Sequence, residues 1–508
     1  MVPPPPDCQP VGCKWVFWVK QHPNGSIAPF KARLIAKGYH QRSGLDYSET
    51  FSPVVKPATI RTVLTMAVMH GWSLRQLDVN NAFLHGNLHE TVYMSQPPGF
   101  QDTTTPHHVC RLNKAIYGLK QAPRAWYSAL QQAILKLGFH NSKADPSLFI
   151  YHSAAVLCYL LVYVDDLVIT GNTPSFLTHV IHQLCIQFSL KDLGTLHYFL
   201  GLDVIPTKNG LFLSQHQYIW DLLFKTNMQG AKDVSSPMST SVQLKLLDST
   251  APCNSTEFRS IIGGLQYLSL TCPDICFAVN KLSQFMHQPT VTHWSAAKCL
   301  LRYLKKTIFL GIHINRQSSF DVTTFANADW AGNYDDRTST SAYITFLGIN
   351  PISWSSKKQR AVVRSSTEAE YRSLATTTSE TVWLMSLFKE LCLPIPSPPR
   401  LLCDNLGATH LSFNPVQHSR MKHIQIDLHF VRDMVQRKIL NVQHVNTHDQ
   451  LADFLTKPLS SQRLHSLLLK IGLADGSSIL RERIKEIPTD SANNPLPPAQ
   501  DCATITQA

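Results

Sequence analysis

Two apolar runs with a pair of acidic residues between them dominate the hydrophobic pattern of this chain. Residues 156–162 are VLCYLLV, and LVIT follows at residues 167–170. Continuous apolar runs of this length indicate buried strands, and two such runs separated by a short polar segment predict a hairpin. Asp165 and Asp166 lie at its turn. A further strand-like stretch, residues 72–77, ends immediately before Asp78, so acidic residues follow two predicted strands.

The rest of the pattern mixes strands with helices. Residues 11–20 alternate aromatic and polar side chains, and the turn signal HPNGS at 22–26 predicts a second hairpin. Apolar residues at helical spacing predict helices at 60–71, 122–138, 211–228 and, for the most part, 258–306. Another strand-rich unit begins near residue 325, and the tail after residue 476 is expected to be disordered because it lacks apolar periodicity. This order of elements predicts an α+β fold.

The adjacent carboxylates beside an apolar core indicate a bound cation. Two negative side chains close together repel one another unless a cation neutralises them, and carboxylate oxygens suit magnesium. The acidic pair alone is as typical of a polar hairpin turn, since Asp is common in turns. Asp78 shifts this balance, because carboxylates at two neighbouring strand ends can hold two divalent ions about 3.5–4 Å apart. That arrangement predicts nucleotidyl transfer at a phosphate.

Further motifs follow one another in a fixed order along the chain. They are KARLIAKGY (31–39), QLDVNNAFL (76–84), YGLKQAPRAWY (117–127), YVDD (163–166), DLGTLHYFLG (192–201), ADWAG (328–332), SSTEAEY (365–371) and LADFLTK (451–457). The motifs up to residue 166 closely resemble the reverse transcriptase of copia-type long-terminal-repeat retrotransposons. The later ones resemble the same polyprotein continuing into its ribonuclease H. The resemblance covers about residues 14–458.

This resemblance implies an α+β right-hand polymerase with fingers, palm and thumb, followed by a helical connection and an α/β ribonuclease H-like domain. The expected boundaries are a proline-rich segment at 1–13, the reverse transcriptase at 14–240, the connection at 241–320, the ribonuclease H-like domain at 321–460 and a short helix with a disordered tail at 461–508. A chain of 508 residues has room for about three folded units.

Charge and cysteine content agree with a nucleic-acid partner inside the cell. The formal net charge of +12 favours a polyanion, because binding phosphates releases condensed counterions, although a basic balance alone is weak support. The 12 cysteines show no C-x-x-C pair, which is typical of reduced thiols. The sequence shows no secretory leader and no apolar run of about 20 residues, so we expect no membrane partner. We expect an intracellular protein of cytoplasmic virus-like particles, with a nuclear stage left open.

The resemblance also assigns roles around the polymerase acids. Asp78 and Asp165 are expected to bind both metal ions, Mg²⁺ or alternatively Mn²⁺, and Asp166 to tune the site. Phe83 is expected to lie beneath the incoming sugar, where it would exclude a 2′-hydroxyl. The alternative for Phe83 is an ordinary core aromatic residue, since aromatic side chains are often buried.

Basic and amide side chains before and after these acids are expected to bind the incoming dNTP. Gln121 precedes a predicted helix start, where free backbone N–H groups favour anions, and the resemblance places it against nucleotide and template. Lys31, Arg33 and Lys37 are spaced evenly on a predicted strand, so they would share one face and could meet the triphosphate. A solvated basic face is an alternative for each of the three.

The ribonuclease H-like part carries an unusual residue at one expected metal ligand. Glu370, Asp404 and Asp453 match three of the family's four catalytic, metal-binding carboxylates, but Asn327 stands where the family usually has Asp. Asn is neutral, so we expect RNA cleavage to be weakened or lost. Asp329 lies two residues further along the strand, displaced by about 6.6 Å, and is too far to replace the missing carboxylate.

Two alternatives concern neighbouring residues of that site. The pattern TEAE at 367–370 resembles a capping box in which Glu370 would bind a backbone N–H instead of a metal. Glu368 and Glu370 would face apart on a helix, so only one could line the site. His444 and His448 lie on a predicted loop before Asp453 and are expected to be surface residues.

Two functions therefore remain in competition. The first is an RNA-directed DNA polymerase with a ribonuclease H-like domain, whose partners would be an RNA template, a DNA primer, an RNA–DNA hybrid and dNTPs. The second is a decayed retroelement relic that binds nucleic acid without catalysis. The three polymerase aspartates favour the enzyme, whereas Asn327 and the start shortly before Lys14 favour the relic. The oligomeric state is left open.

Overall fold

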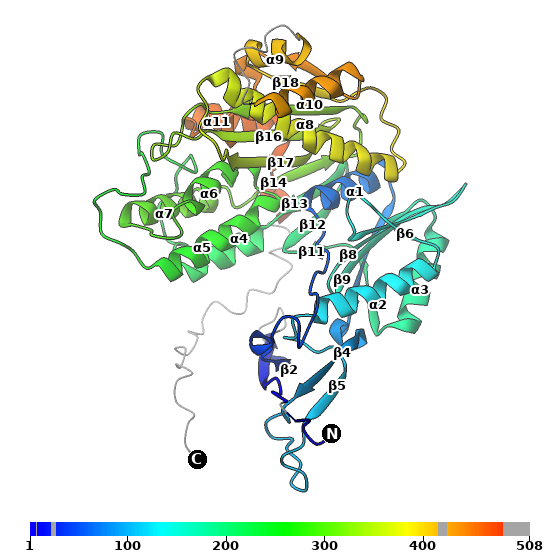
Figure 1. Cartoon of the computed structure of the whole chain (residues 1–508). Coiled ribbons are helices and arrows are strands. Elements are labelled where there is room, and N and C mark those ends of the chain that lie inside the picture. The colour runs from blue at the N-terminus through cyan, green and yellow to red at the C-terminus, as the bar shows by residue number, and fades with distance from the viewer. Residues whose placement is uncertain (7, 22–26, 415–423, 481–508) are drawn as a thin grey trace. The chain divides into compact units, whose positions relative to one another are not determined.

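A computed structural model describes residues 1–6, 8–21, 27–414 and 424–480, and the chain folds into two compact units (Figure 1). The smaller unit comprises Met1–Phe51, Gly86–Ala125 and Ser477–Ala508, and the larger one comprises Ser52–His85 and Trp126–Gly476. The chain therefore leaves the larger unit after one strand of its sheet and returns within a helix. Both acidic sites expected from the sequence belong to the larger unit.

The smaller unit contains two antiparallel hairpins. The first pairs β1 (Cys13–Gln21) with β2 (Ile27–Ala36), which confirms the predicted strands, although the turn at 22–26 lies outside the described residues. The second pairs β4 (Asn87–Met94) with β5 (Cys110–Lys114). Strand β2 ends before Lys37, which is the N-cap of a 3₁₀ segment, Gly38–His40. The expectation that Lys37 shares a strand face with Lys31 and Arg33 was therefore wrong.

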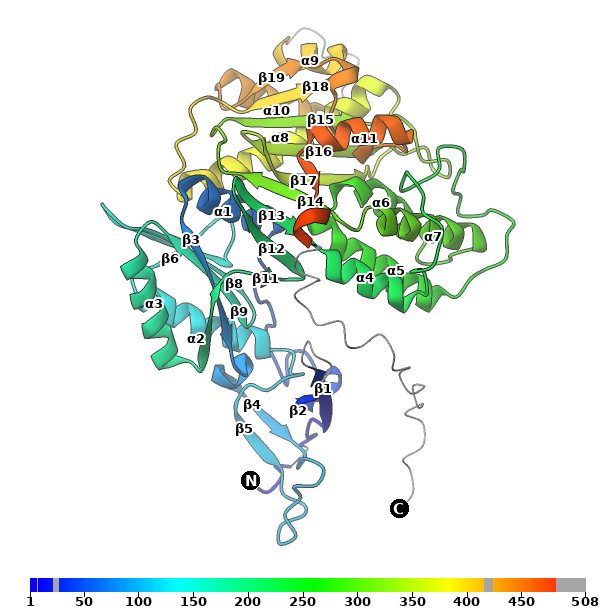
Figure 2. The same ribbon diagram turned by 180° about the vertical axis from the view of Figure 1, so that it is seen from behind.

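A six-stranded antiparallel sheet forms the first layer of the larger unit, in the order β10-β3-β9-β8-β7-β6 (Figures 1 and 2). The strands are β3 (Ser73–Val79), β6 (His140–Asn141), β7 (Leu148–His152), β8 (Leu157–Tyr163), β9 (Asp166–Gly171) and β10 (Leu190–Thr195). Helices α2 (Ala122–Lys136) and α3 (Pro174–Gln187) contribute to the core on one face, and α1 (Pro57–His70) to that on the other. Burial on both faces explains why β8 and β9 are almost continuously apolar.

A second sheet joins segments that are far apart in the sequence, in the order β11-β12-β13-β14-β20. The strands are β11 (Tyr198–Phe199), β12 (Leu202–Thr207), β13 (Gly210–Ser214), β14 (Leu310–Asn315) and β20 (Leu473–Asp475). The predicted helix at 211–228 was thus partly wrong, because its first residues form β13 and only α4 (His216–Lys225) is helical. The helices predicted within 258–306 are confirmed as α5 (Ser255–Tyr267), α6 (Cys276–Ser283) and α7 (Val291–Lys306).

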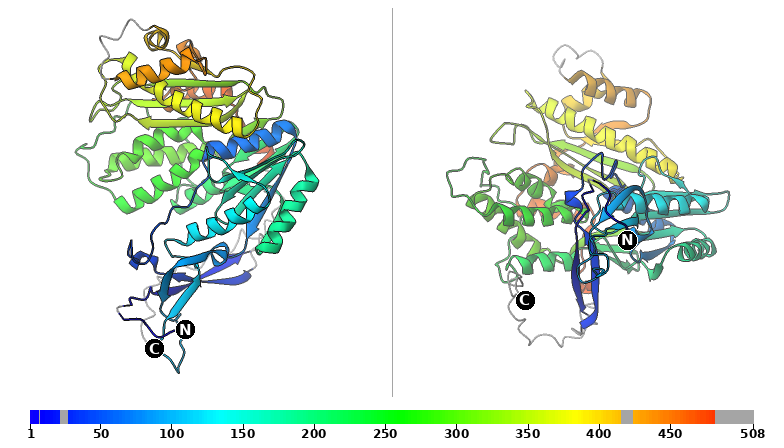
Figure 3. Two further views of the ribbon diagram at one scale, coloured as in Figure 1. Left: turned by 45° about the vertical axis from the view of Figure 1, so that its right-hand side comes forward. Right: turned by 60° about the horizontal axis from the view of Figure 1, so that its bottom comes forward.

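The third sheet has the strand order β17-β16-β15-β18-β19 and contains both parallel and antiparallel pairs. It belongs to the yellow-green to orange part of the chain in Figure 3. Strands β15 (Val322–Ala328), β16 (Thr340–Leu347) and β17 (Asn350–Lys358) are antiparallel, whereas β18 (Arg400–Cys403) and β19 (Asn441–His444) run parallel to β15. The helices of this part are α8 (Ser366–Glu390), α9 (Leu406–Phe413), α10 (Gln425–Gln436) and α11 (Ser461–Lys470). The predicted α+β class is confirmed.

The expected loop positions of His444 and His448 need adjustment. His444 ends strand β19 and is not in a loop, whereas His448 lies in a short 3₁₀ segment, Thr447–Asp449. The tail predicted to be disordered lies outside the described residues from position 481 onward.

Every helix in the described ranges is too short or too polar to cross a bilayer.

Candidate active sites

The turn between β8 and β9 presents the paired aspartates. Val164 adopts a left-handed conformation with φ of 54°, which lets the chain reverse between two buried strands. The buried indole of Trp126 donates from Nε1 to the Val164 carbonyl oxygen at 2.6 Å. The Val79 backbone N–H donates to the Asp165 carbonyl oxygen at 2.9 Å. The turn is therefore fixed from helix α2 and from strand β3.

Strand pairing brings the third acid to this turn. Asp78 lies directly opposite Asp166 in the antiparallel β3–β9 pair, and Tyr163 lies opposite Asp166 on the other side. Side chains that are opposite one another in such a pair project from the same face of the sheet. Asp78, Asp165 and Asp166 are each partly exposed, so their carboxylates are accessible. The structure thus brings together the three acids that the sequence placed at two strand ends.

The charges of these acids act on one another. Burial, followed by the negative charges of Asp165 and Asp78, raises the pKa of Asp166 to about 6, while a hydrogen bond with Gln76 opposes the rise. Repulsion of this kind is relieved when a cation neutralises the cluster. The donor set of carboxylate oxygens fits Mg²⁺ or Mn²⁺. The three acids do not, however, bring their oxygens all within 4.8 Å of one another, a spacing that another site among the described residues does reach.

That other site lies where strand β18 ends beside helix α8. Ligand atoms of Glu370, Cys403 and Asp404 all lie within 4.8 Å of one another. Burial, followed by the charge of Asp404, raises the pKa of Glu370 to about 8. The Gln450 side-chain amide links Asp404 to strand β15, because Nε2 donates to the Ala326 carbonyl at 2.9 Å and to Asp404 Oδ1 at 3.4 Å. A divalent cation would offset the cost of two carboxylates in this buried position.

The capping alternative for Glu370 is excluded by the start of α8. Ser365 caps the helix by accepting a hydrogen bond from the Glu368 N–H at 3.2 Å. The carboxylate of Glu368 accepts from the Arg364 N–H at 3.1 Å and from Arg372. Ser365 is therefore the N-cap, Glu368 is the glutamate that accepts a backbone N–H at the helix start, and the Glu370 side chain lies near Asp404 instead.

The third expected acid of this site, Asp453, is held by internal donors. Asn327 Nδ2 donates to Asp453 Oδ1 at 2.9 Å, and Lys457 Nζ lies 2.7 Å from the same oxygen. Arg463 Nη2 lies 3.5 Å from the other oxygen. Asp329 does not take the place of Asn327, because its carboxylate accepts a hydrogen bond from the Thr340 N–H and burial raises its pKa to about 6. Glu370 and Asp404 thus lie close together, whereas the charge of Asp453 is already neutralised by Lys457 and Arg463.

Comparisons with known proteins place this arrangement in a family. Residues 1–240 match the family described as reverse transcriptase (RNA-dependent DNA polymerase). The chain is also 34% identical to a putative transposon Ty5-1 protein of Saccharomyces cerevisiae, over 60% of this chain and 99% of that protein. The chain belongs to the copia-type retrotransposon Pol family. Its recognition from sequence motifs is confirmed.

The chain spans about a third of the length of the Pol polyproteins that it matches. It is 55% identical to the retrovirus-related Pol polyprotein from transposon RE1 of Arabidopsis thaliana over 93% of its own length, and it spans 32% of that polyprotein. A foamy viral protease-reverse transcriptase, solved in complex with an RNA/DNA hybrid, aligns with 87% of this chain and 51% of its own at 12% identity, with a TM-score of 0.45. The family assignment rests on the sequence relatives.

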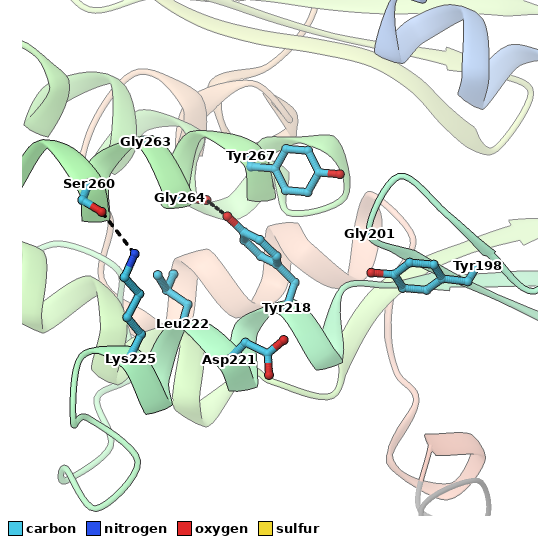
Figure 4. A pocket seen from close by; sticks show the side chains of 10 residues that line it. All are labelled: Tyr198, Gly201, Tyr218, Asp221, Leu222, Lys225, Ser260, Gly263, Gly264 and Tyr267. Carbon is cyan, nitrogen blue, oxygen red and sulfur yellow. Dashed lines mark hydrogen bonds between the residues drawn. The ribbon is translucent and has the colours of Figure 1, made fainter. Parts of the chain in front are cut away.

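Sequence reasoning about this copia-type chain missed a tyrosine-rich pocket in the larger unit (Figure 4). The cavity has a volume of about 630 Å³ and lies between α4, α5 and the β11–β12 turn, with Tyr198, Tyr218 and Tyr267 in its wall. Burial and then neighbouring charges, Asp166 among them, raise the pKa of Tyr198 and raise that of Tyr267 to about 12. Of the sequence motifs, only DLGTLHYFLG at 192–201 contributes residues to the wall of this pocket.

Phe83 lies in a 3₁₀ segment, Ala82–His85, directly after strand β3. Its ring is partly buried and packs against the core shared by α2, α3 and the six-stranded sheet. This position, a few residues beyond Asp78, is compatible both with a core role and with an edge facing the incoming sugar.

The side chains of the smaller unit that are expected to bind the nucleotide differ in their contacts and in their exposure. Gln121 is only 2% exposed, because its Oε1 accepts from Gln41 Nε2 at 2.9 Å and its Nε2 donates to the Asp46 carbonyl at 3.0 Å. Arg33 stacks its guanidinium 4.9 Å from the ring centre of Tyr117. Lys31 is exposed and Lys37 partly so. Gln121 is thus held in place, whereas the two lysines can reorient.

Proposed function

We propose that this chain is an RNA-directed DNA polymerase of a copia-type retrotransposon. The observation that carries the proposal is the pairing of Asp78 opposite Asp166, with Asp165 in the adjoining fixed turn. This placement assembles the carboxylates needed for two divalent ions without any change of strand register. RNA template, DNA primer and dNTPs would be the substrates.

The proposed reaction transfers a nucleotidyl group to the primer. The primer 3′-oxygen attacks the α-phosphorus of the dNTP, the bond from that phosphorus to the bridging oxygen breaks, and diphosphate leaves. Bound Mg²⁺ or Mn²⁺ would lower the pKa of the attacking hydroxyl and neutralise charge on the phosphates. Asp78 and Asp165 would hold the ions. Asp166 would keep the local field negative and so favour their binding.

The nucleotide would be selected by residues that precede Asp78 or lie between Asp78 and Asp165 in the sequence. Phe83 would exclude a 2′-hydroxyl, and Lys31, Arg33 and Lys37 would bind the triphosphate through charge-assisted hydrogen bonds. Gln121 would position the nucleotide against the template from its fixed site at the start of α2.

The ribonuclease H-like domain would bind an RNA–DNA hybrid but cleave it poorly. Glu370 and Asp404 would hold one divalent ion, since their carboxylates lie together. Asp453 is compensated by Lys457, and Asn327 supplies no charge for a second ion. Two-metal cleavage needs ions on both sides of the scissile phosphate. Weak cleavage would therefore accompany intact polymerisation.

RNA-templated primer extension with the full chain and Mg²⁺ tests this proposal. We expect the wild type to extend a DNA primer and Asp165→Asn to lose activity by at least about a thousandfold, as expected for removal of a metal ligand. Asp233→Asn is the matched control, because Asp233 is exposed and its ion pair with Lys305 lies on the surface. A wild-type protein that binds hybrid but extends nothing would support the decayed relic instead.

A further inference from the structure

A second cavity of the larger unit shares no residue with either acidic site. It has a volume of about 300 Å³ and is bounded by the start of α1, the C-terminal end of α5, helix α6 and strand β17. Its lining includes Arg61, Asn280, Trp354 and Ser356, and no Asp or Glu. It lies where sequence-distant segments meet, so neither its shape nor its chemistry is visible from the sequence.

Arg61 places a buried positive charge in this cavity. The residue is 4% exposed, and its guanidinium stacks 3.6 Å from the ring centre of Trp354. Nε donates to the Ile352 carbonyl and Nη1 to the Leu270 carbonyl, each at 2.7 Å. Nη2 has no hydrogen-bond partner among the described residues, so donors of the guanidinium remain unused.

No carboxylate forms an ion pair with this guanidinium within the described part of the chain. Burial lowers the pKa of Arg61 to about 9, and Cys276, Tyr343 and Glu380, in that order, oppose this shift only in part. The guanidinium therefore still carries its charge at neutral pH. An unpaired buried cation is costly, and an anion in the cavity would remove that cost.

Two further polar atoms in the wall lack partners. Asn280 Nδ2 and Ser356 Oγ are buried and make no hydrogen bond with any described residue. In contrast, the hydroxyls of Ser269 and Ser283 already donate to backbone carbonyls, at 2.6 Å and 2.7 Å. A guanidinium, an amide N–H and a hydroxyl, all with unused donors, form a set suited to an anion with several acceptor oxygens.

We propose that this cavity binds a phosphate ester. The planar guanidinium of Arg61 suits two phosphate oxygens, and Asn280 and Ser356 can donate to the remaining ones. The volume lies at the lower end for small-molecule sites and accommodates one nucleotide unit. The phosphate could belong to a free nucleotide or to a nucleic-acid strand, and both sources present the same chemistry to these donors.

Titration of the full-length protein with inorganic phosphate, by calorimetry at constant ionic strength with chloride as the reference anion, tests the proposal. EDTA excludes metal-mediated binding, and Asp165→Asn protein serves as the background, so the outcome does not depend on polymerase activity. We expect saturable binding of phosphate. Adenosine monophosphate and a short oligodeoxynucleotide then compete separately, and displacement by one of them identifies the source.

The variants are chosen to change the site while preserving the fold. Asn280→Asp keeps the side-chain shape but adds a negative charge, so phosphate affinity should fall at least about tenfold. Ser356→Ala should weaken binding by a smaller factor. The matched control is Asn254→Asp, which makes the same chemical change at the N-cap of α5, where Asp is also favoured. Phosphate binding no stronger than chloride binding, or equal affinity in Asn280→Asp and Asn254→Asp, would overturn the proposal.

Discussion

Replacing Asn327 by Asp tests how one side chain limits the ribonuclease H-like site. In the present chain Asn327 Nδ2 donates to Asp453 Oδ1 at 2.9 Å. The substitution removes this donor and sets two carboxylates at about the same separation. With an effective dielectric constant of about 20, two full charges at that distance would repel by about 6 kcal/mol. Lys457 at 2.7 Å and Arg463 at 3.5 Å offset much of this repulsion.

The net loss without metal is therefore smaller. Losing the hydrogen bond and retaining one protonated carboxyl group should lower the free energy of unfolding by about 1–3 kcal/mol. Divalent metal should restore it, because the carboxylate introduced by Asn327→Asp would complete a second cation site, and binding at about a hundred times Kd adds about 2.7 kcal/mol. The melting temperature should consequently rise by several degrees with Mg²⁺ in Asn327→Asp and by less in the wild type.

Two assays on the same protein preparations test whether Asn327 impairs metal binding and RNA cleavage at this site. Melting temperatures are compared in EDTA and in Mg²⁺, and cleavage of a labelled RNA strand in an RNA–DNA hybrid is followed in Mg²⁺. Asn327→Asp should show both the larger metal-induced shift and the faster cleavage. Equal shifts in the two proteins, or strong cleavage by the wild type that the substitution leaves unchanged, would refute the view that Asn327 impairs this site.

Three further predictions concern the larger unit. Phe83→Val should raise ribonucleotide incorporation relative to dNTP incorporation by about tenfold or more, measured by single-nucleotide extension; an unchanged ratio would assign Phe83 to the core alone. Trp126→Phe removes the donor to the Val164 carbonyl and should lower kcat more than it raises the KM for dNTP, whereas an unchanged kcat would contradict the role of this bond. Burial raises the pKa of Asp274 from 3.8 to about 6 despite a hydrogen bond from Tyr303, so its neutral form stabilises the fold at low pH and up to about 3 kcal/mol is lost as pH rises through 6. Urea unfolding at pH 5 and pH 8 should therefore differ less in Asp274→Asn than in the wild type, and an equal difference would count against this assignment.

The sequence predicted local structure best where burial leaves a regular signature. Strands β8 and β9 are covered on both faces, so their apolar runs and the acidic turn were recognisable. Residues 211–214 carry the same apolar character, but they form a strand only because β12 and the distant β14 pair with them. A helical pattern in a single segment cannot reveal such partners, which is why the helix predicted there began too early.

The chemistry of the sites depends even more on contacts between distant residues. The absence of the expected acid at position 327 was visible in the sequence, yet its hydrogen bond to Asp453 across 126 residues was not. Likewise, the TEAE pattern contains two glutamates, and only the position of Ser365 as the N-cap showed that Glu368, and not Glu370, accepts a backbone N–H at the helix start. The tyrosine pocket and the cavity around Arg61 both arise from the packing of several elements. Composition and motif spacing therefore could not predict the cavity around Arg61.

The central claim is that Asp78 and Asp165 hold the catalytic metal ions, with Asp166 beside them. Crystals of the full chain with primer, RNA template, an incoming dNTP and Mn²⁺ would locate the ions directly through anomalous scattering. We expect Mn²⁺ peaks with carboxylate oxygens of both Asp78 and Asp165 at coordination distance. Ordered nucleotide with no Mn²⁺ between these two residues, or with Asp78 turned away from the ions, would contradict the account.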